Sequence, residues 1–169
     1  MKETIINWFV VNLGGKVSKE FIVFLISMVP ILELRGGLIA ASPAILNIDK
    51  WIAIPICMIG NIIPVPFILL LITPIFNWLK GTKRFRPMVE RLEAKAMSKS
   101  DKIERYEFWG LAFFVGIPLP GTGAWTGALI AALLGVKFKK AFPAIILGIC
   151  MAAVIMTVVS YGFLGALVS

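Results

Sequence analysis

The segment ILELRGGLIAA, residues 31–41, places one acid, Glu33, and one base, Arg35, inside an otherwise apolar run. A carboxyl group in an apolar environment can bind and release a proton near the working pH, and a guanidinium offers a planar fork to a phosphate or a carboxylate. The two side chains could instead neutralise each other as a permanent structural pair. Because residues two apart point to different faces of a helix, such a pair needs irregular backbone, which Gly36 and Gly37 could provide.

A second stretch, GIPLPGTGAWTG at residues 116–127, contains no charge but could bind an anion through its backbone. Glycines free backbone N–H groups, and helix N-termini and glycine nests hold anions without a charged side chain. The alternative is close helix packing through small residues, which the same composition also favours.

Asn61 is a third polar candidate, because it lies next to Gly60 and shortly before Pro64 and Pro66. It could coordinate an ion or cap a helix kink at these prolines.

From these three stretches we predict Glu33 as the ion-coupling residue. The predicted substrate-binding residues are Arg35, Gly36, Gly37, Asn61, Pro118, Pro120, Gly121, Thr122, Gly123, Trp125 and Thr126.

Composition decides which solvent surrounds these residues. Hydrophobic residues make up 59% of the chain and charged residues 15%, whereas an ordinary soluble domain has about 25% charged residues. The segments without Asp, Glu, Lys or Arg are residues 51–79, 108–136 and 141–169. Each is longer than the roughly 20 residues that cross the hydrocarbon core as a helix. We predict an integral, multi-pass protein of the plasma membrane with a single membrane domain, residues 1–169.

The residue types that the chain lacks argue against catalysis. It has no histidine, no Ser/His/Asp set, no carboxylate pair within its apolar segments and no P-loop. Its two cysteines, Cys57 and Cys150, lie in apolar segments, where small packing residues are expected rather than a disulfide or metal ligands. We therefore expect no enzyme activity, no metal and no cofactor.

The remaining charge lies mainly at the N-terminus and in one connector. Residues 1–20 predict a short helix in the membrane interface rather than a signal peptide, because apolar residues recur at helical spacing and no cleavage site follows. Residues 80–107 carry nine Lys or Arg and five Asp or Glu, interleaved with apolar residues, which predicts a helical, water-facing connector. Their basic excess fits a cytoplasmic orientation and anionic lipid headgroups better than nucleic acid.

The chain contains an internal repeat. The sequence GGLIAASPAILNIDKWIAIPICMIGN at residues 36–61 aligns with GALIAALLGVKFKKAFPAIILGICMAA at residues 127–153. Both begin G-x-L-I-A-A, pass a short loop with lysine, and continue through an apolar segment that has a proline and a later glycine. The two repeats extend over residues 21–79 and 108–169.

Proline, glycine or polar residues interrupt the first segment of each repeat. Non-helical backbone at membrane depth is tolerated only where protein or a water-filled cavity covers it, which favours a re-entrant helical hairpin. A hairpin plus one membrane-spanning helix per repeat inverts the second repeat, as in many secondary transporters. If all four segments span, the repeats are parallel, and positive charges do not separate the two topologies. The predicted fold is therefore an all-α membrane protein with two inverted repeats, an N-terminal interfacial helix and a cytoplasmic helical connector.

The stretches VPILELRGGLIAA and GIPLPGTGAWTGALIAALLG resemble the bacterial and archaeal family of small multidrug export proteins, over nearly the whole chain. This family looks like a compact relative of the DedA membrane superfamily, whose members have inverted repeats of a re-entrant hairpin plus membrane helices. The resemblance implies that Glu33 occupies the acidic position of the first DedA hairpin. The arginines of the second DedA hairpin have no counterpart in residues 115–127, and Arg35 is the candidate for the missing positive charge.

These observations predict a secondary transporter coupled to an ion gradient, with proton exchange at Glu33. Its substrate would be amphipathic: Glu33 favours an organic cation, as in drug export, whereas Arg35 and the second hairpin favour a lipid phosphate, as in a flippase. The alternative is a membrane scaffold or assembly protein in which the Glu–Arg pair is structural. The expected partners are membrane lipids and the substrate, and no nucleic acid is expected. Because four membrane segments form only a thin bundle, a homodimer is also plausible.

Overall fold

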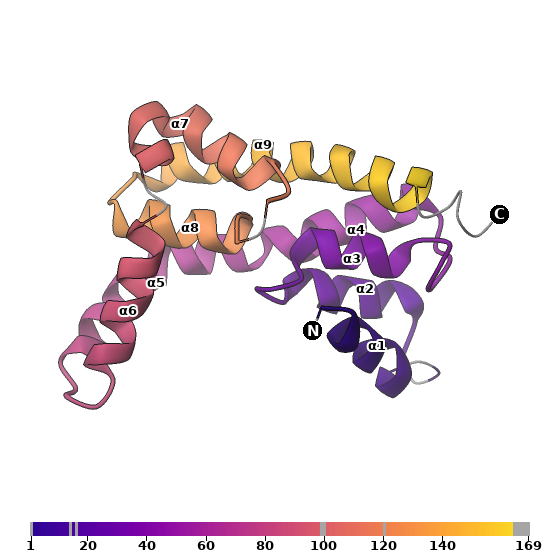
Figure 1. The fold of residues 1–169 in the computed structure, drawn as a ribbon, viewed down its shortest axis with the longest axis horizontal. Helices are drawn as coiled ribbons and strands as arrows, with labels where there is room; N and C mark the ends of the chain where they lie inside the picture. The colour runs from indigo at the N-terminus through magenta and orange to yellow at the C-terminus, as the bar shows by residue number, and fades with distance from the viewer. Residues whose placement is uncertain (1, 14, 16, 99–100, 120, 164–169) are drawn as a thin grey trace. The chain divides into compact units, whose positions relative to one another are not determined.

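The computed structural model describes residues 2–13, 15, 17–98, 101–119 and 121–163, and the regular secondary structure of these residues is helical (Figure 1). The helices are α1 (Lys2–Leu13), α2 (Lys19–Met28), α3 (Glu33–Ala41), α4 (Lys50–Ile62), α5 (Pro64–Lys80), α6 (Arg86–Met97), α7 (Asp101–Gly116), α8 (Ala124–Leu133) and α9 (Phe138–Thr157), followed by the π-helical turn η1 (Val158–Phe163). The prediction of an all-α chain is confirmed for these residues.

The helices form two compact units. The first unit comprises the chain up to Ile63 together with the chain from Ile149, and the second unit runs from Pro64 to Gly148. The first unit therefore contains the hairpin of the first predicted repeat with α4, together with the second part of α9. The second unit contains the hairpin of the second predicted repeat with the first part of α9, together with α5. The prediction of one membrane domain stays a prediction.

Local sequence signals explain where several helices begin. The side chain of Ser18 accepts a hydrogen bond from the backbone N–H of Phe21 at the start of α2, over 3.3 Å. Asp49 accepts one from the N–H of Trp51 at the start of α4, over 2.8 Å. Both satisfy backbone donors that have no partner within the helix. Pro64 is the first residue of α5, a position where its missing N–H costs nothing.

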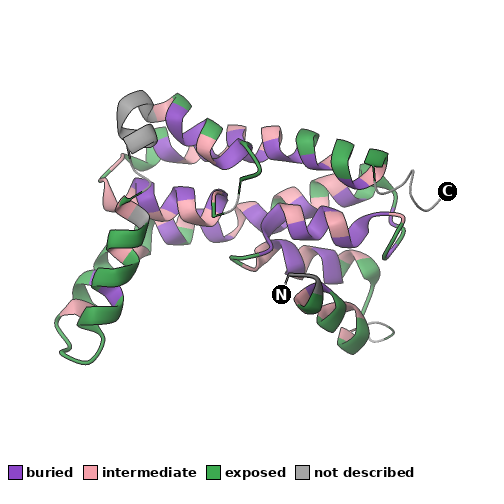
Figure 2. Cartoon of the chain, viewed as in Figure 1, coloured by how far each residue is buried: buried purple, intermediate pink, exposed green. Residues whose placement is uncertain are grey.

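In the first unit, α2, α3 and α4 pack closely because glycines remove side chains at their contacts. A Cβ atom on Gly37 of α3 would overlap Ser27 Oγ of α2 and lie 2.9 Å from Cys57 Sγ of α4. A Cβ atom on Gly60 of α4 would lie 2.7 Å from the carbonyl oxygen of Phe24 in α2. Figure 2 shows many buried residues on α2 and α3, whereas α6 in the second unit is largely exposed.

The second unit shows the same kind of contact. A Cβ atom on Gly148 of α9 would lie 2.7 Å from the carbonyl oxygen of Ala112 and 2.6 Å from Val115 Cβ, both in α7. A Cβ atom on Gly127 of α8 would lie 2.6 Å from Val115 Cγ2. Gly148 therefore meets α7 as Gly60 meets α2, and the sequence repeat pairs these two glycines. The orientation of the repeats in a membrane stays a prediction.

A hydroxyl group from the later part of each long helix binds the last turn of a hairpin arm. In the first unit, Tyr161 Oη lies 3.2 Å from the carbonyl oxygen of Ala41 and 2.8 Å from that of Ile48. In the second unit, Thr73 Oγ1 donates to the carbonyl oxygen of Ala132 over 3.3 Å. Ala41 and Ala132 end the two G-x-L-I-A-A motifs, so the same position of the repeat accepts a hydrogen bond in both units.

Two helices in the described part of the chain are long and apolar enough to cross a membrane, by length and composition. They are Lys50–Lys80, which joins α4 and α5, and Phe138–Phe163, which joins α9 and η1. In their most apolar stretches only 33% and 39% of the residues are buried within the chain, and Phe67, Leu70 and Val154 are among the exposed side chains. Apolar surface of this extent is expected to contact lipid or another protein rather than water.

The hairpin arms are shorter than these spans. Helices α2 and α3 contain 10 and 9 residues, and α8 contains 10, so each is about 15 Å long at a rise of about 1.5 Å per residue. Helix α7 contains 16 residues, because it begins at Asp101, inside the predicted connector. Helix α7 therefore includes residues that the sequence predicted to be part of the polar connector.

We expect Gly60→Ala and Gly148→Ala to lower the thermal midpoint of the protein by several degrees. Each added methyl group would press on a backbone carbonyl oxygen, and overpacking of this kind costs about 1–3 kcal/mol. The matched control is Gly162→Ala, because a Cβ atom there meets nothing within 4 Å. Thermal unfolding of the purified variants, followed by circular dichroism, measures the effect. Equal midpoints for all three variants would contradict the close packing.

Candidate functional site

The first candidate site lies where the first hairpin turns between α2 and α3. The backbone N–H groups of Leu32 and Glu33 donate to the carbonyl oxygen of Val29, over 3.1 and 2.9 Å. Glu33 has a φ of +52°, a left-handed conformation that is uncommon for a residue with a side chain. It is nevertheless only 5% exposed. A buried acid in a strained backbone conformation is typical of functional sites.

The irregular backbone that Gly36 and Gly37 could have provided lies at Glu33 instead. Both glycines are helical residues of α3. The chain reverses before them, so the strain falls on the first residue of the helix. The glycines serve close contact: a Cβ atom on Gly36 would lie 2.6 Å from Leu32 Cβ, and Gly37 faces α2 and α4.

Arg35 lies two residues further along α3 and is half-buried. Its guanidinium is attracted electrostatically by the Glu33 carboxylate. An arginine keeps its positive charge in almost any protein environment, so the attraction persists whenever Glu33 is ionised. The first unit thus holds an acid and a base that interact at the turn of a hairpin.

Asn61 joins this group through the packing of α3 against α4, which run antiparallel (Figure 1). Gly37 of α3 lies opposite Cys57 of α4. One turn back along α3 and one turn forward along α4, Glu33 and Asn61 come to the same level. Asn61 is 3% exposed, and its Oδ1 atom has no hydrogen-bond partner among the described residues. A buried acceptor left without a partner costs about 1–3 kcal/mol, so this oxygen is a candidate ligand-binding atom.

The second stretch forms the turn between α7 and α8 in the second unit, which confirms the predicted interruption there. Gly121 and Gly123 have φ of +77° and +141°, conformations that favour glycine. The hydroxyl oxygen of Thr122 lies 3.0 and 2.9 Å from the carbonyl oxygens of Ile117 and Leu119. Thr122 therefore stabilises the turn itself.

The other predicted residues of this stretch differ in exposure. Pro118 is exposed, and Gly123 is buried at the N-cap of α8. Trp125 and Thr126 are half-buried in the first turn of α8. Pro120 lies outside the described residues. The described residues of this stretch belong to the second unit, whereas the acid, the base and the asparagine described above belong to the first.

Two buried serines of the first unit were not predicted from the sequence. Ser42 is the C-cap of α3, and Ser160 lies in η1. Both are fully buried, and within the described part of the chain their hydroxyl oxygens have no hydrogen-bond partner. A π-helical turn is frequent at functional sites. The available signal was a serine in an apolar segment, which is equally typical of helix packing.

The described residues include no group of three or more His, Cys, Asp or Glu side chains that could hold a metal ion. Both cysteines are free thiols, and Cys57 is buried, as predicted for a packing residue, whereas Cys150 is half-buried.

The described residues form an all-helical protein with a buried acid at a hairpin turn and with two helices long and apolar enough to span a bilayer, which indicates a membrane protein. The chain belongs to the family described as "Putative small multi-drug export protein", which matches residues 33–155, more than two thirds of the sequence. Neither a curated protein nor a solved structure matches the chain. The match begins at Glu33, directly after the first hairpin turn, and includes the turn between α7 and α8. The family seen in the sequence is thus confirmed, and its kinship with DedA proteins stays a prediction.

The left-handed conformation of Glu33 predicts opposite effects of glycine at two neighbouring positions. Glu33→Gly should be more stable than Glu33→Ala by about 1 kcal/mol, because a Cβ atom costs roughly 1–2 kcal/mol in this conformation. Arg35→Gly should be less stable than Arg35→Ala by about 1 kcal/mol, because Arg35 is helical. Thermal midpoints of the four purified variants test this. The same order at both positions would contradict the backbone assigned to Glu33.

Proposed function

We propose that the protein is a secondary transporter that exports an amphipathic substrate across the plasma membrane in exchange for protons, with Glu33 as the coupling group. The name of the family denotes small multi-drug export, which agrees with a transporter rather than with an enzyme class. The observation that carries the proposal is the burial of Glu33 at a helix break, packed beside a helix long enough to span a membrane.

The lengths of the helices support a re-entrant hairpin around Glu33. At about 15 Å, α2 and α3 each reach roughly half of the ~30 Å hydrocarbon core. A pair of arms that enters and leaves on one side would carry Glu33 to the middle of the membrane. Helix α8 has the same length as α2, so we propose a second re-entrant hairpin, and hence inverted repeats, each completed by one of the two candidate spans.

At that depth Glu33 can exchange a proton for a cation. A carboxylate in apolar surroundings is costly unless a proton or a positive charge neutralises it. The positive charge of Arg35 lowers the free-energy cost of the ionised Glu33 but leaves the carboxylate able to bind a proton or a cation. Asn61 adds an acceptor oxygen at the level of Glu33. A proton and a cationic substrate would then compete for Glu33, and this competition couples their opposite flows.

The substrate class that we propose is an amphipathic organic cation. Glu33 is more deeply buried than Arg35, and burial of a carboxylate favours a ligand that brings a positive charge close to it. The turn before α8 has no charged side chain that would hold an anion. A lipid phosphate would instead depend on Arg35 and on backbone N–H groups of that turn.

The distribution of positive charge suggests how the chain is oriented in the membrane. We propose that residues 80–107 face the cytoplasm, because positive charge is enriched in cytoplasmic loops. The N-terminal helix α1 is proposed to lie in the membrane interface, since exposed Trp8 and Val11 give it an apolar surface.

The test is uptake of a fluorescent lipophilic cation into proteoliposomes that contain the purified protein and carry a pH gradient. Glu33→Gln cannot release a proton, so we expect at least a tenfold loss of gradient-driven uptake with the fold retained. The matched control, Glu20→Gln, removes an acid from the first turn of α2 in the same unit and should keep the native rate. Undiminished uptake by Glu33→Gln would refute the coupling role.

Ligand-induced thermal stabilisation then separates the substrate classes. A lipophilic cation should stabilise the native protein, and Glu33→Gln should lose this effect. Stabilisation by a polyprenyl phosphate that Arg35→Gln abolishes would replace the cation with a lipid phosphate. No stabilisation by either ligand, together with no uptake by the native protein, would favour the scaffold alternative and overturn the transporter.

A further inference from the structure

Helix α6 separates its charges onto two sides. On one side, Arg86 donates a hydrogen bond to Glu90 over 2.8 Å, and Glu93 pairs with Lys80 of α5 over 2.5 Å. The spacings of four and three residues place Arg86, Glu90 and Glu93 on the same helix face. These ion pairs neutralise that face and attach it to the end of α5.

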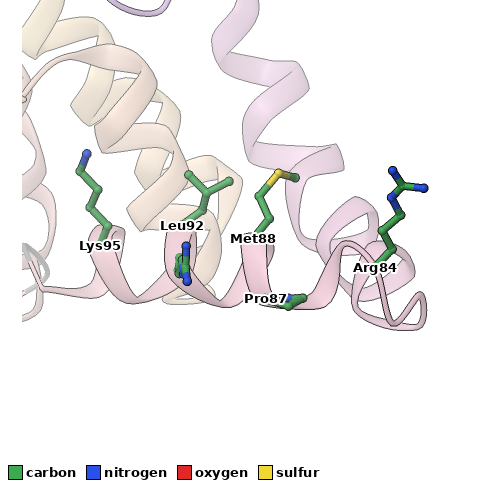
Figure 3. A pocket seen from close by; sticks show the side chains of 6 residues that line it. Arg84, Pro87, Met88, Leu92 and Lys95 are labelled. Atoms are coloured by element: carbon green, nitrogen blue, oxygen red, sulfur yellow. The ribbon is translucent and has the colours of Figure 1, made fainter.

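Another side of α6 borders a groove of about 480 Å³ (Figure 3). The residues that line the groove are Arg84, Pro87, Met88, Arg91, Leu92 and Lys95. Figure 3 shows the side chains of Met88, Leu92 and Lys95 directed to one side of the helix, with Arg84 at the end nearest the preceding turn. The ion pairs of the described residues do not involve the three basic side chains, so the groove carries three positive charges.

The combination of charge and apolar surface fits an amphiphilic anion. Met88 and Leu92 are 50% and 43% exposed and lie between the basic side chains. A free phosphate would use the charges and leave both apolar side chains in water. A lipid with an anionic headgroup uses both, because its phosphate can meet Arg and Lys while its glycerol and upper acyl chain cover Met88 and Leu92.

The attachment to α5 places the groove near the end of a candidate membrane span. Lys80 is the last residue of Lys50–Lys80, and its ion pair with Glu93 holds α6 against that end. Trp78, 74% exposed in the last turn of α5, is a residue type enriched at the membrane–water interface. An acidic peptide would match the charge, but lipid headgroups already lie at this level.

We propose that the groove along α6 is a binding site for the headgroup of an anionic membrane lipid. Occupancy would hold α6 and the connector on the membrane surface. The site is separate from Glu33 and does not depend on the proposed transport activity, because binding is measured without any substrate or gradient.

Native mass spectrometry of the full-length protein in detergent, titrated with phosphatidylglycerol or with phosphatidylcholine of the same acyl chains, tests this site. Phosphatidylglycerol should bind at least tenfold more tightly. The triple variant Arg84→Gln, Arg91→Gln and Lys95→Gln should lose that preference, since each basic residue near an anionic surface contributes a several-fold gain in affinity. Met88→Gln with Leu92→Gln should weaken phosphatidylglycerol binding without abolishing the preference for it.

The control triple variant is Lys137→Gln, Lys139→Gln and Lys140→Gln, which removes the same charge from the start of the second span. It should bind phosphatidylglycerol as the native protein does, and an equal loss would mean diffuse attraction and overturn the site. Glycerol phosphate competing as strongly as the lipid would overturn the lipid assignment, and so would an acidic peptide that displaces it. Unchanged thermal midpoints in all variants show that the differences report binding.

Discussion

The cost of placing charge and unpaired backbone groups in an apolar environment is the constraint on which this structure depends. Glu33 stands at a helix break, where both a carboxyl group and irregular backbone must be protected. Helices α2, α3 and α4 pack against one another in the first unit, and Arg35 lies two residues from Glu33 on α3. Where lipid surrounds a protein, charged side chains and irregular backbone must find partners inside the protein. Because this is costly, a charge at such a place is usually kept for a functional reason.

Protection requires helices to approach closely, and glycine makes that possible at related positions of both units. Gly60 lies against a carbonyl oxygen of α2, and Gly148 lies against a carbonyl oxygen of α7. The hydroxyl groups of Tyr161 and Thr73 bind the ends of corresponding hairpin arms. Because each unit contains parts of both repeats, neither repeat can complete its packing alone. The two long helices are therefore structural elements of both units.

The same constraint explains the distribution of charge along the chain. The candidate spans carry charge only at their ends, where Lys50, Lys80 and the lysines that begin α9 can reach water. Helix α6 follows directly, with one face neutralised by ion pairs and another left basic and apolar. An amphipathic helix directly after an apolar span is the order expected where a chain passes from hydrocarbon to lipid headgroups.

The sequence by itself indicated the membrane character, determined the helical class, the family and the interruptions at both hairpin turns, and pointed to Glu33 and Arg35 as candidate site residues. These features depend on composition and on local breaks such as proline and glycine, which act within a few residues. Tertiary structure alone decided that Glu33, rather than the glycine pair, adopts the left-handed conformation, and that Asn61 Oδ1 is buried without a hydrogen-bond partner among the described residues. It also decided which serines are buried and which face of α6 is left free of ion pairs. The physical reason is that these features depend on the register between helices, and apolar residues of similar size allow many registers until packing selects one.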